Sequence, residues 1–349
     1  MPAALLALAL GLASSTMAID LAPIPDAPFA KPDGPIRARL SDAPAGCTLV
    51  LMDAAGAERG RAQAKAGDLD LAALLPALRG AERAMRVQAV VDGTPVGAPL
   101  VVVPLEVRPT IRTVDALRPD GATHYTRIVG WGNRLLDESD PKMRELRAAW
   151  PKEDPTPRSG FRVERDRDVV FETTAGRIRF AMRPDCAPAT ARNFVELAER
   201  GFYDGTIVHR IVPKDRNGNP FVIQGGDPTG TGDGGPGYDI PLEPSALPHD
   251  FGVVSMARND WPDSAGSQWF VGLSREGTAR LDGQYCAFGE VVEGAEALVA
   301  IAAGEIGDAQ AQRPKNPVTV TRAFVQPSKP WIPGTGRPEA RVVRPAAAK

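Results

Sequence analysis

Short apolar runs separated by turn-forming residues dominate the first third of the chain. Strands are predicted where such runs are rich in valine and end at turn residues; four of them cover residues 36–40, 47–52, 86–91 and 98–103. Asp92-Gly93 lies between the last two runs and indicates a hairpin turn. This pattern predicts a small β-rich domain over residues 35–107.

The pattern weakens over residues 108–165, where it predicts a connector with one helix. Asp140 is a good N-cap, Pro141 suits the first helical position, and the apolar residues that follow share one face. Three further prolines then end the helix and extend the chain.

The second half again alternates between strand-like and turn-like segments. Strands are predicted over residues 168–174, 177–183, 206–212, 251–256, 268–273, 285–292 and 318–325. Two helices interrupt them, one from Pro188 to a glycine cap at Gly201 and one over residues 295–302. Many strands with only two helices and long glycine-rich loops favour a closed antiparallel barrel with helical plugs. The chain as a whole is therefore predicted to be mainly β.

Proline-rich segments flank the predicted domains. Residues 19–34 are predicted to be a linker, and residues 327–349, with five prolines and a terminal Ala-Ala-Ala-Lys, a disordered tail. The β-rich domain that follows the linker has a leucine-rich stretch crossing before its last hairpin. In pattern it resembles an immunoglobulin or fibronectin type III sandwich, and an unrelated α+β module is the alternative.

Composition and charge exclude several classes of protein. The chain has 35 Gly and 34 Pro among 349 residues, about a fifth and below the roughly 25–30% that marks low-complexity disorder. The balance of 41 basic and 43 acidic residues argues against binding of nucleic acid. Three histidines and three cysteines are scattered without the spacing of a zinc site or a redox pair, so no metal and no cofactor is predicted.

The N-terminus predicts export. An uncharged apolar run over residues 3–13 precedes small residues at Thr16 and Ala18, as in a signal peptide over residues 1–18, although no Lys or Arg precedes the run. The run is shorter than the roughly 20 residues needed to span a bilayer, and no other stretch predicts a membrane span. We expect a periplasmic or extracellular protein, with a cytoplasmic one as the alternative.

One charged residue lies on an apolar strand face. In the strand predicted over residues 206–212, alternation places Arg210 on the same face as two valines. A guanidinium there is unfavourable unless it is paired or used, so a structural ion pair and a functional role are both open. His209 faces the other side and is expected to be a core histidine with satisfied hydrogen bonds.

Several separate motifs in the second half follow the order of a known family. They are Asn193-Phe194, His209-Arg210-Ile211-Val212-Pro213, Phe221 through Asp227, Ser255-Met256-Ala257, Gly266 through Phe270, Leu281-Asp282-Gly283 and Phe288 through Gly294. On these motifs, residues 166–326 resemble the cyclophilin-type peptidyl-prolyl cis-trans isomerases. The resemblance implies an eight-stranded antiparallel barrel capped by two helices, with a proline-binding groove on its outer wall.

The resemblance also implies roles for single residues. The implied catalytic residues are Arg210, Phe221, Gln224 and Phe270. The implied substrate-binding residues are Val222, Ala257, Arg258, Gln268, Leu281 and Tyr285. The partners would be proline-containing polypeptides, with the proline in an apolar pocket and the backbone held by Gln224, Ala257, Arg258 and Gln268.

The chemistry of the implied reaction fits these residue types. Rotation about an X-Pro bond meets a barrier of about 18–20 kcal/mol because twisting destroys amide resonance. No bond breaks, so neither a nucleophile nor a metal nor a cofactor is required. The twisted prolyl nitrogen gains a lone pair that a guanidinium can hydrogen-bond, whereas the planar ground state offers no such acceptor.

Departures from the family pattern modify this prediction. Residues 214–220 lengthen the loop beside the pocket, Arg258 stands where many members have Asn, and Tyr285 where many have His. Arg280 stands where cyclosporin-sensitive members have Trp, so weak or no cyclosporin binding is predicted.

A glycine-rich segment over residues 230–235 formally matches a dinucleotide-binding fingerprint. That motif must open a helix, and Pro236 with the residues after it cannot do so. An ordinary loop beside the groove is therefore predicted.

The predicted function is that of a peptidyl-prolyl cis-trans isomerase acting on folding or exported proteins, without a covalent intermediate. The alternative is a non-catalytic module that binds proline-containing peptides. The presence of all four implied catalytic residues favours the enzyme.

Overall fold

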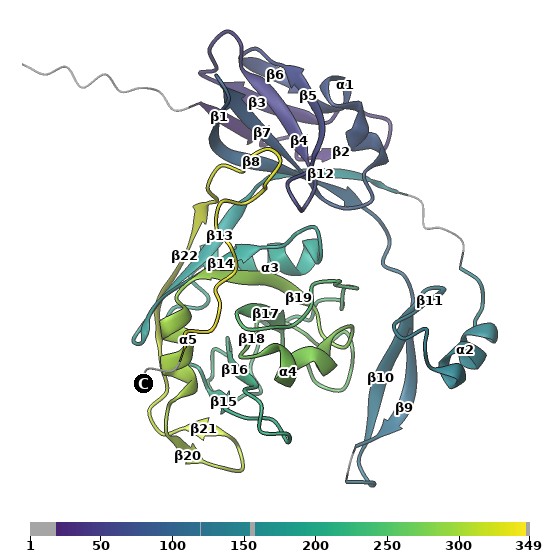
Figure 1. Ribbon diagram of the computed structural model, residues 1–349, viewed down its shortest axis with the longest axis vertical. Coiled ribbons are helices and arrows are strands. Elements are labelled where there is room, and N and C mark those ends of the chain that lie inside the picture. Colours follow the sequence, from purple (N-terminus) through teal and green to yellow (C-terminus); the bar gives the residue numbers. More distant parts are fainter. Residues whose placement is uncertain (1–18, 119, 154–157, 347–349) are drawn as a thin grey trace, which may run out of the picture.

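The computed structural model describes residues 19–118, 120–153 and 158–346. The predicted signal peptide, residues 1–18, lies outside these ranges. Figure 1 shows a β-rich domain at the top, a curled sheet with its helices below it, and an arm of strands and one helix at the side. Within the described ranges, no helix is long and apolar enough to cross a membrane.

Two antiparallel sheets build the N-terminal domain. The first has the order β1-β3-β6, with strands at Asp20–Pro23, Arg37–Ser41 and Gly67–Asp70. The second has the order β2-β12-β8-β7-β4-β5, with strands at Phe29–Ala30, Gly160–Arg165, Thr94–Leu105, Met85–Val91, Thr48–Met52 and Glu58–Gln63. Apolar residues of both sheets, such as Leu40 and Leu49, share one core. The domain is therefore a β-sandwich.

The leucine-rich stretch between β6 and β7 closes one side of this sandwich. It forms helix α1 (Leu71–Leu74) and the 3-10 helix η1 (Pro76–Gly80). Asp70 caps α1, because its carboxylate accepts hydrogen bonds from the backbone of the first turn. Leu75 and Leu78 then pack into the same core.

The structure corrects the predicted elements of this region. The four predicted strands correspond to β3, β4, β7 and β8, but β1 and β2 lie within the predicted linker, 19–34. β12 lies within the predicted connector, 108–165, and pairs with β8 from Gly160 opposite Leu105 to Arg165 opposite Leu100. Its pairing partner lies far earlier in the chain, so the local pattern of residues does not reveal it.

A three-stranded sheet and one helix lie within residues 108–153, and we call this region the arm. Its strands β9 (Ile111–Leu117), β10 (His124–Trp131) and β11 (Arg134–Leu135) have the order β11-β10-β9. Helix α2 (Pro141–Ala148) begins as predicted, with the Asp140 carboxylate accepting from the Lys142 N–H at 2.9 Å. The predicted connector thus contains a sheet in addition to its helix.

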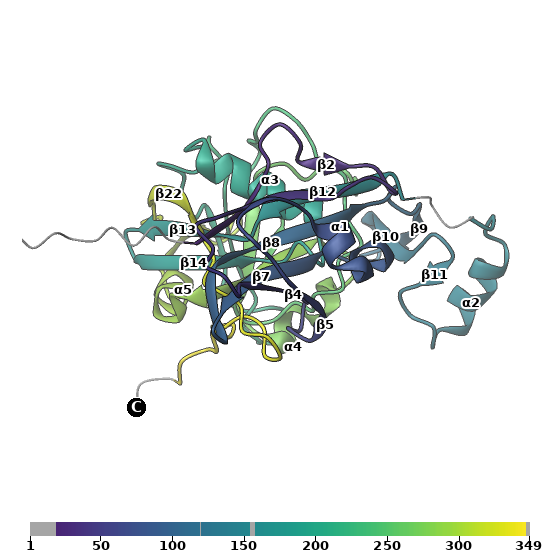
Figure 2. The same ribbon diagram turned by 90° about the horizontal axis from the view of Figure 1, so that it is seen from above.

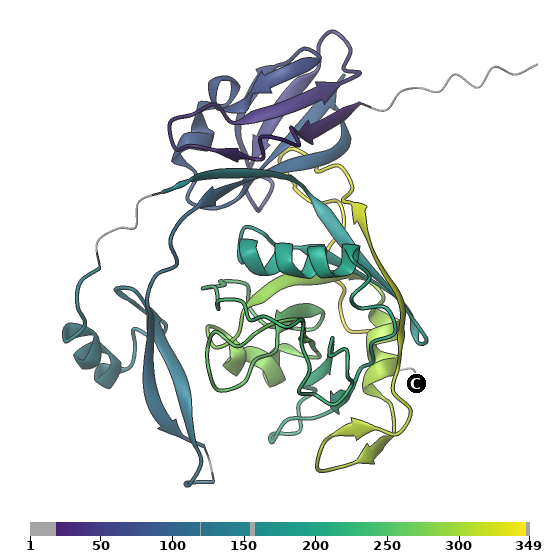
Figure 3. The ribbon, with the colours of Figure 1, turned by 180° about the vertical axis from the view of Figure 1, so that it is seen from behind.

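The arm lies beside the curled sheet, as Figures 2 and 3 show from above and from behind. The Gln284 side chain donates to the Ile128 carbonyl at 2.7 Å and accepts from the Ile128 N–H at 3.0 Å. Arg118 pairs with Asp260 at 3.0 Å, and Arg108 forms a two-pronged ion pair with Asp263. These contacts fix the arm against the loops of the C-terminal domain.

Eight antiparallel strands form the curled sheet. Their order is β15-β16-β18-β17-β19-β14-β13-β22, at Arg210–Val212, Val222–Gly225, Trp269–Gly272, Val253–Met256, Ala287–Glu293, Gly176–Met182, Arg167–Thr173 and Val320–Pro327. Val208 N–H donates to the Val318 carbonyl, and Val320 N–H to the Thr206 carbonyl. These bonds join the segment before β15 to β22, so the two ends of the sheet meet.

Helices α3 (Pro188–Glu199) and α5 (Ala295–Ala302) plug this sheet, as predicted. Phe194 of α3 is fully buried, with its ring centre 5.7 Å from that of Phe171 and 5.0 Å from that of Phe288. Leu298 and Ile301 of α5 join the same core. The domain also contains the short helix α4 (Arg275–Thr278), the 3-10 helix η2 (Ala279–Leu281), and a hairpin of β20 (Ile306–Asp308) and β21 (Arg313–Pro314).

Residues 328–346 are packed against both domains, which corrects the predicted disorder of this part of the tail. Trp331 is only 3% exposed and contacts Val50 and Met52 of the sandwich. Further along, the Val342 N–H donates to the Val291 carbonyl at 2.9 Å. The proline content predicts disorder, but one buried indole and backbone hydrogen bonds anchor the segment.

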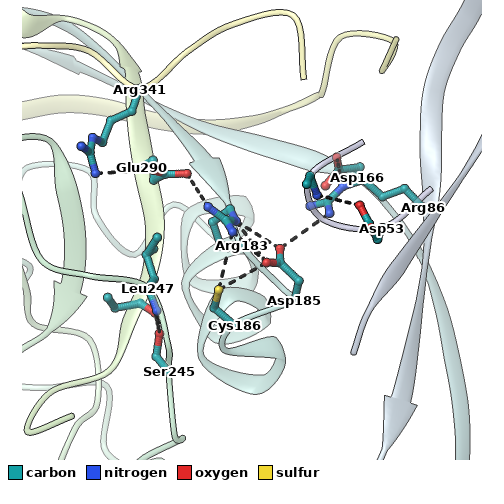
Figure 4. Close-up of polar contacts among 12 residues, drawn as sticks. Asp53, Arg86, Asp166, Arg183, Asp185, Cys186, Ser245, Leu247, Glu290 and Arg341 are labelled. Atoms are coloured by element: carbon teal, nitrogen blue, oxygen red, sulfur yellow. Dashed lines mark hydrogen bonds and ion pairs between the residues drawn. The ribbon is translucent and has the colours of Figure 1, made fainter. Parts of the chain in front are cut away.

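A buried arginine joins the sandwich to the C-terminal domain (Figure 4). Arg86 on β7 is fully buried, with Nε 3.0 Å from Asp166 and Nη1 3.6 Å from Asp185. Its guanidinium also lies 3.9 Å from the ring centre of Trp331. Burial opposes ionisation of Asp185, but Arg86 and Arg183 outweigh it and hold its pKa at about 2. The two domains therefore share a charged, desolvated contact.

Candidate active site

A cluster of apolar side chains lies on the outer face of the curled sheet, where the resemblance implies the proline pocket, and we refer to this cluster as the apolar pocket. Its buried members are Val212, Val222, Phe270 and Leu281, and Phe221, Ala257 and Tyr285 pack against them. This cluster is separate from the core inside the barrel. The structure thus brings together Phe221, Val222, Phe270 and Leu281, which the resemblance implies as the lining of the proline pocket, and adds Val212 to them.

The pleat of neighbouring strands explains how this face forms. On β16, Val222 joins the pocket, whereas the next residue, Ile223, packs inside the barrel. Across the sheet, Arg210 lies opposite Gln224 on β16, and Gln224 lies opposite Phe270 on β18. Residues directly opposite one another share a face. Arg210, Gln224 and Phe270 therefore form one row beside the pocket.

Arg210 is held by two amides. Its Nη1 donates to Gln224 Oε1 at 3.1 Å, and its Nε and Nη2 both donate to Gln312 Oε1, at 2.9 and 2.7 Å. Burial lowers the pKa of the guanidinium, and the nearby Tyr285 opposes this shift. Among the described residues, no carboxylate forms an ion pair with Arg210, so the structural ion pair considered for this residue is not what holds it.

A polar cavity of about 500 Å³ adjoins this row. Gln224, Ala257, Arg258 and Gln268, the residues predicted to hold the substrate backbone, all line it. Gln224 donates to Gln268 at 3.0 Å, and Gln268 in turn donates to the carbonyls of Gly232 and Gly234, at 2.8 Å each. The two glutamines therefore link the arginine to the wall of the cavity.

Comparisons with known proteins match this domain to one family. Residues 168–325 match the family model described as cyclophilin type peptidyl-prolyl cis-trans isomerase/CLD. A peptidyl-prolyl cis-trans isomerase-like 1 of Neurospora crassa is 39% identical over 163 residues, which cover 45% of this chain and 93% of that protein. Peptidyl-prolyl cis-trans isomerase B of Bacillus subtilis is 41% identical over 132 residues, 37% of this chain and 86% of that protein.

The chain belongs to the cyclophilin-type peptidyl-prolyl cis-trans isomerase family. Among solved structures, a Cryptosporidium parvum cyclophilin crystallised in the presence of the dipeptide Ala-Pro has a TM-score of 0.41 and 30% identity, covering 46% of this chain and 98% of that one.

The glycine-rich loop of this cyclophilin domain is organised by its own carboxylate. Asp227 accepts from the N–H groups of Gly232 and Gly234, at 2.6 and 3.1 Å, and from Thr229. Burial opposes the charge, but these hydrogen bonds outweigh it and hold the pKa of Asp227 at about 2. Since a protein carboxylate already takes the amides that a phosphate would need, the loop is structural, as the sequence predicts. In the described residues, no group of three or more acidic, His or Cys side chains is placed to hold a metal ion.

The residues that depart from the family pattern lie around the same site. Arg258 donates to the Gln284 carbonyl at 3.0 Å through Nη2, and its guanidinium lies 4.9 Å from the Tyr285 ring centre. The guanidinium of Arg280 lies 4.4 Å from the ring centre of Phe221. Arg258 therefore braces Tyr285 as well as lining the cavity, and Arg280 places a charge beside the apolar pocket.

Two residues near the site, His249 and Gln312, are not predicted from the sequence. His249 stacks on Phe270, with ring centres 5.7 Å apart, and its two ring nitrogens lie 2.9 and 3.0 Å from Asp282 and Ser255. It thereby holds the Phe270 ring of the apolar pocket in place. Gln312 contacts Arg210 from 102 positions away in the chain. Both contacts join segments that are distant in sequence, and no motif or periodicity signals them.

His209 differs from its predicted state. It is buried, as expected, but neither ring nitrogen has a hydrogen-bond partner among the described residues. Burial lowers its pKa from the ordinary 6.5, with the nearby Asp227 opposing this shift and Arg313 and Arg210 adding to it. The folded protein therefore keeps His209 neutral at a pH where the unfolded chain begins to protonate it.

This difference predicts a pH-dependent stability. As pH falls below about 6.5, the unfolded chain gains a proton that the folded protein does not bind, so the free energy of unfolding decreases by up to about 1.4 kcal/mol per pH unit until the folded pKa is reached. Urea unfolding at several pH values between 7.5 and 5 should show a smaller decrease for His209→Gln than for the wild type. Identical pH dependence of the two proteins would contradict this reading of His209.

Proposed function

We propose that this protein accelerates cis-trans rotation about X-Pro peptide bonds, with Arg210 as its central catalytic residue. The observation that carries the proposal is the row of Arg210, Gln224 and Phe270 along an apolar pocket. A proline ring in the pocket would bring its amide nitrogen beside the guanidinium. A hydrogen bond to that nitrogen forms only when the amide twists, so it stabilises the transition state selectively.

The energy of one hydrogen bond is too small for fast catalysis, so the apolar pocket is proposed to accelerate the rotation as well. A hydrogen bond from a charged group contributes roughly 1.5–3 kcal/mol, or about one to two decades in rate. A second contribution comes from the apolar walls, Phe221, Phe270 and Leu281. A planar amide is more dipolar than a twisted one, so excluding water beside these buried or partly buried side chains raises the ground state relative to the transition state.

The substrate class proposed here is a proline-containing polypeptide in extended form. Gln224 and Gln268 present amide groups along the polar cavity next to the proline pocket. An extended backbone carries an acceptor at every residue and a donor at every residue except proline, and these amides can pair with such groups. Val222, Ala257 and Tyr285 would complete the walls of the groove.

A protease-coupled assay tests the proposal. The substrate is a tetrapeptide with one X-Pro bond, whose cis form is cleaved only after isomerisation. The rate constant of the slow phase should rise in proportion to the concentration of the full-length protein. A slow phase that stays at the uncatalysed rate would support the alternative, a non-catalytic module that binds proline-containing peptides.

Weak cyclosporin binding is a further expectation. The Arg280 guanidinium, stacked 4.4 Å from the Phe221 ring centre, places a charge where an apolar macrocycle would have to desolvate it. In a fluorescence titration, Arg280→Trp should bind cyclosporin at least about ten-fold more tightly than the wild type, because an indole adds apolar contact area in place of the charge. A nanomolar dissociation constant for the wild type would contradict the prediction.

We also propose that the protein is exported. The support is the apolar run over residues 3–13 with small residues at Thr16 and Ala18. Mass spectrometry of the protein purified from its own cells would give the mature N-terminus. A mature chain that begins near Ile19 supports export, and an intact N-terminus in the cytoplasmic fraction rejects it.

For the N-terminal sandwich we propose a fibronectin type III-like topology. The support is the separation of β1, β3 and β6 from a second sheet in which β8, β7, β4 and β5 are consecutive neighbours. A crystal structure with β6 paired to β4 instead would reject this topology.

A further inference from the structure

The guanidinium of Arg210 is fixed along one particular edge. A guanidinium carries five N–H groups in a rigid planar fork, one on Nε and two on each Nη. Gln312 Oε1 accepts from Nε and Nη2, at 2.9 and 2.7 Å, and Gln224 Oε1 accepts from Nη1 at 3.1 Å. These three bonds leave one N–H on each Nη for a further acceptor.

Gln312 itself is held in place by its backbone. It has a φ of 55°, in the left-handed region that residues with a β-carbon seldom adopt. Its carbonyl accepts from the Ile211 N–H at 2.9 Å, so its main chain binds the strand that carries Arg210 while its side chain binds Arg210. The next residue, Arg313, donates to the carbonyls of Gly230 and Thr231, both at 3.0 Å. The amide is thus anchored from two sides.

We propose that Gln312 is a positioning residue, which takes the Nε–Nη2 edge of Arg210 and thereby directs the remaining Nη N–H groups toward the proline pocket. This inference rests on the proposed isomerase function. A long arginine side chain loses rotamer freedom when it is ordered, and an arginine ordered in advance needs no reorganisation during the reaction. The acceptor is a neutral amide, so the guanidinium keeps its full charge for the twisted prolyl nitrogen.

The test compares Gln312→Met with the wild type. Methionine keeps the length of the side chain and removes the acceptor. The matched control is Gln310→Ala, since Gln310 is an exposed residue of the same hairpin. We expect kcat for Gln312→Met to fall about ten-fold. A guanidinium that is no longer positioned loses much of its hydrogen bond to the twisted prolyl nitrogen, and one such bond contributes about that factor. KM and the thermal unfolding midpoint should stay at wild-type values, and Gln310→Ala should match the wild type throughout. A wild-type kcat in Gln312→Met overturns the proposal.

A double-mutant cycle separates positioning from a general effect on the fold. In an Arg210→Ala background no guanidinium remains to be positioned, so adding Gln312→Met should change kcat/KM by less than about two-fold. A full ten-fold loss in that background would overturn the positioning role. A wild-type protein without isomerase activity would instead reject the proposed function itself, so the two failures are distinguishable.

Discussion

Replacing Arg210 with alanine is expected to lower kcat/KM for X-Pro isomerisation about 100-fold, the upper end of what a charge-assisted hydrogen bond supplies. The upper end applies because Gln224 and Gln312 already orient the guanidinium beside the pocket. The bond forms in the twisted state, so kcat should carry most of the loss and KM little of it. The protease-coupled assay measures both parameters.

The matched control for this variant is Arg216→Ala. Arg216 is an exposed arginine on the loop between β15 and β16, so its loss changes the net charge equally without touching the row of site residues. Arg210→Lys tests geometry separately, because lysine keeps the charge but lacks the planar fork that two glutamines can hold. If Arg210→Ala retained the kcat/KM of the wild type, the role assigned to this residue would be wrong.

Replacing Arg86 with alanine is expected to lower the free energy of unfolding by about 3 kcal/mol, the lower end for removing one partner of a buried ion pair. The loss comes from Asp166 and Asp185, which remain buried between the two domains (Figure 4). The lower end applies because Arg183 still pairs with Asp185, at 2.9 Å. The variant also removes the cation beneath the Trp331 ring.

Equilibrium urea unfolding followed by tryptophan fluorescence measures this effect. Arg83→Ala is the control, since Arg83 is an exposed arginine that precedes the same strand. We expect Arg83→Ala to change stability by less than about 0.5 kcal/mol, as is usual for surface positions. Equal stability of Arg86→Ala and Arg83→Ala would show that the buried arginine does not hold the domains together.

Local sequence patterns predict the strands around the pocket, but they do not predict the residues that hold the site in place, Gln312 and His249. Alternation over residues 206–212 predicts that Arg210 shares an apolar face with Val208 and Val212. The structure places Arg210 in the outer row and Val212 in the outer cluster, but Val208 packs inside the barrel, because β15 begins only at Arg210 and the alternation does not extend before it. Period-two alternation is a property of neighbouring residues, which a single sequence displays. Gln312 and His249 reach the site from distant loops, and only tertiary packing brings them there.

The difference between local pattern and distant contact also explains which elements of the fold are predicted wrongly. β12 belongs to the sandwich because it pairs with β8, but the sequence of residues 160–165 does not indicate which strand it pairs with. The segment after β22 is rich in proline, which locally favours disorder. Trp331 nevertheless packs into an apolar site on the sandwich, and its backbone N–H donates to Gln88 Oε1 at 2.8 Å. Propensity and composition act locally, whereas these contacts are decided by burial against a distant surface.

Exchange NMR on a short peptide with one X-Pro bond tests the central claim most directly, because it reports binding and rotation in one sample. With a catalytic amount of the wild-type protein, cross-peaks between the cis and trans forms should appear within about a second, although uncatalysed exchange takes tens of seconds or more at 25 °C. The same amount of Arg210→Ala should produce far weaker cross-peaks. Chemical-shift changes that show the peptide bound to the wild type, without exchange cross-peaks, would contradict the account and leave a binding module.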